Sequence, residues 1–239
     1  MRVQFSPAAP QGLVAQLVER STYIRKVPGS RPGRPTTLMI RKKSTKDLEK
    51  EREKNREKLK ANRIPIYVVA DSIRSLDNVG LLFRLCELLR VRKLYLCGIT
   101  GYPKGQKFDR RHPWKIERAD QRIKKTAIYA VPFVPWEYRR SALFVVKKLK
   151  SEGIQIVALE QAFGALDYRE VNYKLPLALI VGHEIKGVSQ KIINEADAVV
   201  EIPIFGIGNS LNVSIASGIA LYKIIEKTKP FGPYKPTHS

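Results

Sequence analysis

Cysteine and long apolar runs are scarce in this chain of 239 residues. The two cysteines, Cys86 and Cys97, stand inside apolar segments and have no spacing typical of metal ligands. We therefore expect no metal site and interpret both cysteines as reduced core residues of a cytoplasmic protein. No apolar run approaches the length of a transmembrane helix, which argues against a membrane protein.

Acidic residues are also few relative to basic ones. Asp and Glu number 22 against 44 Lys and Arg, so the formal charge is +22. Such an excess favours a polyanionic partner, because each phosphate that a cation neutralises releases counterions. A solubilised surface or a membrane-surface protein would also explain it, but nucleic acid is the favoured interpretation. The length and the 44% hydrophobic content predict one domain with a substantial core.

Residues 1–38 differ from the rest in being rich in Pro and Gly and poor in apolar periodicity. By composition this segment is a disordered basic extension, and polar interruptions argue against a signal peptide. A second hypothesis is that it is non-native, because residues 12–20 and 26–36 can be encoded by DNA that resembles the D-arm and T-arm of a tRNA gene. Translation would then start at Met39, and a tRNA gene would lie in the nucleotide sequence upstream of that codon.

Residues 39–62 form a basic segment in which charges alternate in sign, often three residues apart. This pattern predicts a solvated helix with weak ion pairs, which we favour over a dedicated RNA-binding arm. The domain proper is expected at residues 63–229, followed by a tail at residues 230–239.

Within the domain, β-rich apolar runs alternate with helical patterns. Strands are predicted at residues 64–70, 93–99, 127–135, 155–159, 177–181 and 198–204. Helices are predicted at residues 81–89, at 139–151 and from about residue 212, the last being apolar on nearly every side and therefore buried. The alternation predicts an α/β domain with a mainly parallel sheet flanked by helices.

An irregular basic insertion is expected at residues 100–126. Its cations, among them Arg110, Arg111 and Lys115, are interleaved with aromatic side chains, a combination that suits phosphates and unstacked bases. An ordinary solvated loop is the alternative, although a loop of this length in a compact domain is more often functional.

Two apolar runs end in glycine-containing loops and predict a ligand crevice at the strand ends. Taken singly, however, their glycines could simply turn the chain, and Ser210 or Asn212 could simply cap a helix. Arg84 is out of character among leucines. It either reaches water at the helix edge, paired with Glu87 or Asp77, or contacts a ligand.

Three separated motifs together resemble the signatures of the SpoU-like branch of the SPOUT RNA methyltransferases. They read Asn78-x-Gly80-x-x-x-Arg84, then Gly182-x-Glu184-x-x-Gly187, then Ile202-Pro203-Ile204 followed by Ser210-Leu211-Asn212-Val213-Ser214. Motifs in this order are far more specific than any single glycine pattern. The resemblance implies a SPOUT α/β fold whose C-terminal segment forms a trefoil knot, an exception to the rule of unknotted connections.

The resemblance also implies chemistry. S-adenosylmethionine would bind against the knot through the backbone of four residues, and its methyl group would pass to a ribose 2′-hydroxyl of tRNA or rRNA. The four residues are Leu159, Gly182, Ile202 and Leu211. A non-catalytic RNA-binding protein on the same scaffold and a basic structural protein of the ribosome or nucleoid remain alternatives.

Arg84 corresponds to the family's catalytic arginine. A guanidinium keeps its proton up to a pKa above about 12, so stabilisation of the emerging alkoxide or a phosphate-coupled proton path is easier than general-base catalysis. The resemblance implies that Asn78, Glu184, Ser210 and Asn212 position Arg84, RNA and cofactor, with Glu184 expected to hold Arg84 in a forked pair. It further implies a homodimer, consistent with the surplus apolar surface of the first-motif helix and the last helix.

Overall fold

The computed structural model describes residues 62–231 and, before them, residues 42, 44, 46, 47, 50 and 53. The chain divides into two units, residues 1–55 and 56–239. In the first unit, Lys46, Asp47, Lys50 and Glu53 are helical. Ser44 and Asp47 cap this segment reciprocally, with the Ser44 amide donating to Asp47 Oδ2 and the Asp47 amide donating to Ser44 Oγ. Residues 1–38 and 232–239, expected to be an extension and a tail, lie outside the described residues.

The second unit contains a sheet of seven parallel strands in the order β3-β2-β1-β6-β4-β7-β5. The strands are β1 (Ile64–Asp71), β2 (Val91–Cys97), β3 (Trp136–Arg139), β4 (Gln155–Leu159), β5 (Leu166–Asp167), β6 (Leu177–Val181) and β7 (Ala198–Glu201). The predicted α/β architecture with a parallel sheet is confirmed. Parallel pairing brings the carboxyl ends of all strands to one edge, where ligands of open α/β sheets bind.

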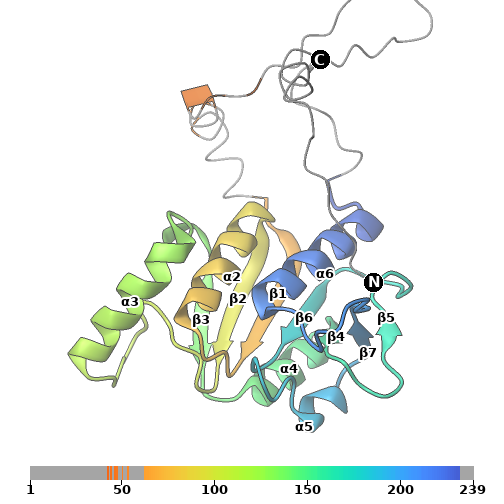
Figure 1. Cartoon of the computed structure of the whole chain (residues 1–239). Helices are drawn as coiled ribbons and strands as arrows, with labels where there is room; N and C mark the ends of the chain where they lie inside the picture. The colour runs from red at the N-terminus through yellow and green to blue at the C-terminus, as the bar shows by residue number, and fades with distance from the viewer. Residues whose placement is uncertain are drawn as a thin grey trace, which may run out of the picture. The chain divides into compact units, whose positions relative to one another are not determined.

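Helices cover both faces of the sheet (Figure 1). One face carries α2 (Leu76–Leu88), α3 (Pro113–Ala127) and α6 (Val213–Thr228), and the other carries α4 (Ala142–Ser151) and the short α5 (Gln190–Ile193). Alternate residues of a strand enter opposite cores, so that Val68 packs under α2 while Val69 packs under α4. Cys86 and Cys97 are buried, one in each core, and burial raises the pKa of both thiols to about 12.

The predicted strand at residues 127–135 is wrong. Helix α3 continues to Ala127, Ile128 ends it with a φ of 59°, and a 3-10 turn at Val131–Phe133 precedes β3. Two prolines, Pro132 and Pro135, remove backbone donors from this stretch, so pairing begins only at Trp136.

The predicted irregular insertion is also corrected, because most of its second half is helix α3. Most residues of α3 are charged or polar, so its narrow apolar stripe is difficult to recognise in the sequence. The stripe consists of Ala119, Ile123 and Ala127, which recur at helical spacing and are buried. The stripe packs on α2 so closely that a Cβ on Gly80 would collide with Thr126 Oγ1 and the Ile123 carbonyl. In addition, Thr126 Oγ1 donates a hydrogen bond to the Asp77 carbonyl at 3.0 Å. Helix α3 is therefore fixed against the start of α2.

Helix α6 begins after its N-cap Asn212 and crosses the sheet beside α2 (Figure 1). It was expected to be buried all round, yet one side of it is exposed, including Ile215 at 57% and Tyr222 at 60%. The buried side is lined by small residues such as Ser217 and Ala220, which let the helix lie close to the sheet. The trefoil knot stays a prediction.

Candidate functional site

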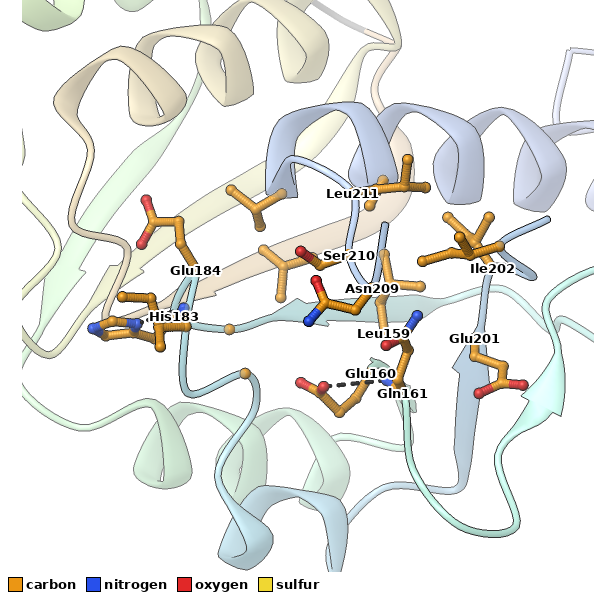
Figure 2. A pocket seen from close by; sticks show the side chains of 17 residues that line it. Leu159, Glu160, Gln161, His183, Glu184, Glu201, Ile202, Asn209, Ser210 and Leu211 are labelled. Atoms are coloured by element: carbon orange, nitrogen blue, oxygen red, sulfur yellow. Dashed lines mark hydrogen bonds between the residues drawn. The ribbon is translucent and has the colours of Figure 1, made fainter. Parts of the chain in front are cut away.

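A pocket of about 430 Å³ opens at the carboxyl ends of β4, β6 and β7. Leu159 and Val181, the last residues of β4 and β6, line the pocket together with Ile202, which directly follows β7. The segment from Asn209 to Leu211 closes the side nearest α6 (Figure 2). The polar residues Glu160, Glu201, Asn209 and Ser210 also line the pocket. A concave site with an apolar wall and a few polar groups is typical of small-molecule binding.

Gly182 lines the pocket where the second-motif loop, residues 182–187, begins. A Cβ on Gly182 would collide with the backbone of Gly187 and Val188. The loop folds back on itself, since His183 and Gly187 exchange backbone hydrogen bonds of 3.1 and 2.8 Å. Gly187 has a φ of 64°, which is in the left-handed region that glycine adopts most easily. These contacts explain both glycines of the second motif without any ligand.

Glu160 anchors this loop and was missed by sequence reasoning. Its carboxylate accepts hydrogen bonds from the Val188 amide at 2.6 Å and from the Gln161 amide at 3.1 Å. The available signal was an acid directly after a buried strand, a position that faces the ligand edge of a parallel sheet. Glu160 therefore holds the second-motif loop against the end of β4.

One polar network joins the three motifs. Asn78 Nδ2 donates to Glu184 Oε1 at 3.0 Å, and Asn212 Nδ2 donates to Asn78 Oδ1 at 3.0 Å. Asn212 Oδ1 in turn accepts from the backbone amide and hydroxyl of Ser214, at 2.9 and 2.6 Å, and so caps α6. The capping role considered for Asn212 is therefore real, and the same side chain also links α6 to α2.

Glu184 completes the network at the start of α2. Its Oε2 accepts from the Arg74 amide at 2.9 Å and its Oε1 accepts from the Ser75 amide at 3.0 Å. Partial burial raises the pKa of Glu184, but these bonds and the one from Asn78 outweigh burial, so the net pKa lies below the usual 4.5. The carboxylate is thus held ionised at the positive end of the helix.

The expected forked pair between Glu184 and Arg84 is wrong, because Glu184 is occupied by groups at the start of α2. Arg84 is exposed on α2, outside the pocket wall, and has no hydrogen bond or ion pair within residues 62–231. Pairing with Asp77 is also wrong, because Asp77 holds Arg122 at 2.8 Å. A single chain therefore does not bring Arg84 into the pocket.

The remaining predicted residues are distributed as follows. Leu159, Gly182, Ile202 and Leu211, predicted to contact the cofactor, all line the pocket, as does Ser210. Arg110 and Lys115 are exposed. Arg111 is not free, since its guanidinium pairs with Asp109 at 2.6 Å and lies 3.4 Å above the ring of Tyr102.

Among residues 62–231 there is no group of His, Cys, Asp and Glu arranged to hold a metal, and no helix long and apolar enough to cross a membrane.

Known proteins resemble this chain in both sequence and fold. The model of the SpoU rRNA Methylase family matches residues 65–222. The tRNA (guanosine(18)-2′-O)-methyltransferase of Aquifex aeolicus is 31% identical over 193 residues, covering 78% of this chain and 81% of that protein. The protein of the same name from Escherichia coli K12 is 37% identical over 89 residues, covering 37% of this chain and 39% of that protein.

Two solved structures are also similar. The TrmH/SpoU tRNA modifying enzyme of A. aeolicus has a TM-score of 0.58 and 29% identity, with 77% of this chain and 86% of that chain covered. The AdoMet-bound rRNA methyltransferase of Sinorhizobium meliloti has a TM-score of 0.57 and 26% identity, with 70% of this chain and 59% of that chain covered.

We predict that Glu184→Gln destabilises the domain by about 1 kcal/mol at neutral pH, because the amide nitrogen would face backbone donors at a partly solvated site. Because the pKa of Glu184 is lower in the folded state than in the unfolded chain, its carboxylate contributes its full stabilisation of the fold above pH 4.5. This contribution is lost as the pH falls through the lower, folded-state pKa. The difference from the unmodified chain in urea unfolding should therefore shrink in acid. Glu170→Gln, at an exposed loop position, is the matched control. A Glu184→Gln effect that persists unchanged at about pH 3 would contradict the assignment.

Proposed function

We propose that this chain methylates tRNA. It belongs to the SpoU rRNA methylase family and is an S-adenosylmethionine-dependent RNA ribose 2′-O-methyltransferase. The Aquifex aeolicus relative supports this choice, because the similarity extends over most of both chains. Guanosine 18 is consequently the first nucleotide to examine. The observation that carries the tRNA proposal is this similarity over most of both chains. The alternative of a non-catalytic RNA-binding protein is disfavoured separately, because the motif residues Glu184, Asn78 and Asn212 are all present and joined by hydrogen bonds beside the pocket.

The pocket fits the cofactor on its own geometry. Its volume of about 430 Å³ lies in the range of small-ligand sites, about 300–1,000 Å³. Leu159, Ile202 and Leu211 would contact the flat base, and Gly182 also lines the pocket. S-adenosylmethionine supplies a methyl group on a positively charged sulfur, a good electrophile. The chain therefore has to orient the hydroxyl and manage its proton and charge.

We assign Arg84 the role of stabilising charge on the reacting ribose oxygen or its neighbouring phosphate. A guanidinium is a poor base at neutral pH but a strong hydrogen-bond donor to an anion. Because Arg84 is exposed and unpaired within residues 62–231, it is available to RNA. It lies on α2 between the exposed Leu81 and Leu88, a position that bears on assembly.

We propose a homodimer whose interface includes the exposed apolar sides of α2 and α6. Leu81 and Leu88 are seven residues apart on α2, and Ile215 and Tyr222 are seven apart on α6, so each helix presents one stripe. The two helices lie side by side (Figure 1). Paired stripes of this kind are typical of protein interfaces. A second subunit on this surface would lie next to Arg84, so the proposed dimer and the proposed role of Arg84 concern the same side of α2.

RNA contacts are proposed for Arg110 and Lys115, which are exposed, whereas Arg111 is assigned to holding the loop through Asp109 and Tyr102. Replacing Arg110 and Lys115 by Gln should reduce the slope of log affinity against log salt by about two units, one per lost phosphate contact. An unchanged slope would leave both residues as ordinary surface cations.

Arg84→Lys should retain cofactor affinity and lose most methyl transfer, because the charge survives while the planar donor fork does not. Calorimetry with S-adenosylmethionine measures the first, and mass spectrometry of digested tRNA and rRNA from a deletion strain complemented with either form measures the second. Near-normal turnover of the variant would remove Arg84 from the mechanism. A methylated nucleotide that is lost from rRNA alone would refute tRNA as the substrate.

For the dimer, sedimentation equilibrium at micromolar concentration should give twice the chain mass. Ile215→Asp should shift this equilibrium to monomer, because a carboxylate would be buried in an apolar contact. Phe144→Asp is the matched control, since Phe144 is similarly exposed but lies on α4 across the sheet. An unmodified chain that is active and purely monomeric would disprove the assembly.

A further inference from the structure

A second hollow, of about 470 Å³, adjoins the cofactor pocket at the start of α2. The two hollows share part of their wall, Glu184 and Ile185. The rest of the second wall comes from the start of α2 and from α3, and its members are Arg74, Ser75, Leu76, Asn78, Arg118 and Arg122. Any group held here lies beside the cofactor pocket. We call this hollow the arginine groove.

Helix α3 supplies two of the three arginines on one face. Arg118 and Arg122 are four residues apart, one helical turn, and so project in the same direction. Arg122 is oriented by Asp77, which accepts from Nε at 3.1 Å and from Nη2 at 2.8 Å. The close contact of α3 with Gly80 fixes the distance of this face from α2. The arginines are therefore presented by a rigid surface.

The groove carries unbalanced positive charge. Arg74 and Arg118 form no side-chain hydrogen bond or ion pair within residues 62–231, and both are exposed. The one acid in the wall, Glu184, already accepts from the amides of Arg74 and Ser75 and from Asn78. Asp77, beside the groove, is neutralised by Arg122. An anion entering the groove therefore meets free guanidinium donors rather than internally satisfied pairs.

We propose that the arginine groove binds an RNA phosphodiester adjoining the ribose that is methylated. This inference rests on the proposed function, which makes RNA the polyanion that must approach the cofactor pocket. Two free guanidinium groups beside the reacting centre would fix the backbone on one side of the ribose and so align its hydroxyl. Arg118 and Arg74 are RNA-positioning residues in this proposal. Arg122 is paired with Asp77 and is therefore not counted among the free guanidinium groups.

The experiment measures tRNA binding by fluorescence anisotropy across a range of salt concentrations, with Arg118→Gln, Asp77→Asn and Arg92→Gln compared. Arg118→Gln should bind on the order of fivefold more weakly near physiological salt and lose about one unit of salt slope. Asp77→Asn should bind more tightly, because it removes a negative charge and releases Arg122. Arg92→Gln is the matched control, since Arg92 is exposed at the opposite edge of the sheet, at the start of β2.

Calorimetry with S-adenosylmethionine should give the same affinity for all four proteins, which shows that the variants are folded and that the effect is specific to RNA. If Arg118→Gln keeps the wild-type slope of log affinity against log salt, or if Arg92→Gln loses as much slope, the arginine groove is not a phosphate site. Neither result would affect methyl transfer by the unmodified chain. Failure of the unmodified chain to methylate any RNA would instead refute the proposed function, and the binding data would still decide whether the groove holds a phosphate.

Discussion

The carboxylate of Glu184 at the start of α2 is the contact on which the arrangement of the site depends. It accepts hydrogen bonds from the backbone amides of Arg74 and Ser75 and from the side-chain amide of Asn78. Asn78 in turn accepts a hydrogen bond from Asn212, the N-cap of α6. Three segments far apart in sequence are thereby fixed around one negative charge. Hydrogen bonds to an ionised acceptor are among the stronger ones, and a helix N-terminus adds favourable backbone dipoles.

The glycines next to this network have steric rather than chemical roles. Gly182 lets the second-motif loop fold against the end of β6, and Gly80 lets α3 lie directly on α2. In each case an added methyl group would displace backbone, which is much less adaptable than a side chain. Close packing at these two points shapes one wall of the pocket at the strand ends and sets the position of the arginine groove.

Helix α2 carries both Asn78 of the polar network and Arg84. One side of this helix is buried in the core with Asn78 at its start, and another side exposes Arg84 between two leucines. The polar network and Arg84 therefore leave α2 in different directions. Helix α2 thus joins Glu184, which lines the pocket, to the exposed surface that we propose a second subunit covers.

The sequence by itself determined the parallel α/β sheet, the buried cysteines and the three motifs, because burial periodicity and glycine spacing are local properties. It failed where charge obscured periodicity, as in α3, whose apolar stripe of Ala119, Ile123 and Ala127 is narrow. It also failed for polar partners: Glu184 binds the amide of Arg74, 110 residues away, rather than Arg84. Hydrogen-bond partners across such separations are chosen by packing, which brings one donor within reach and not another, and only the tertiary structure decides that choice.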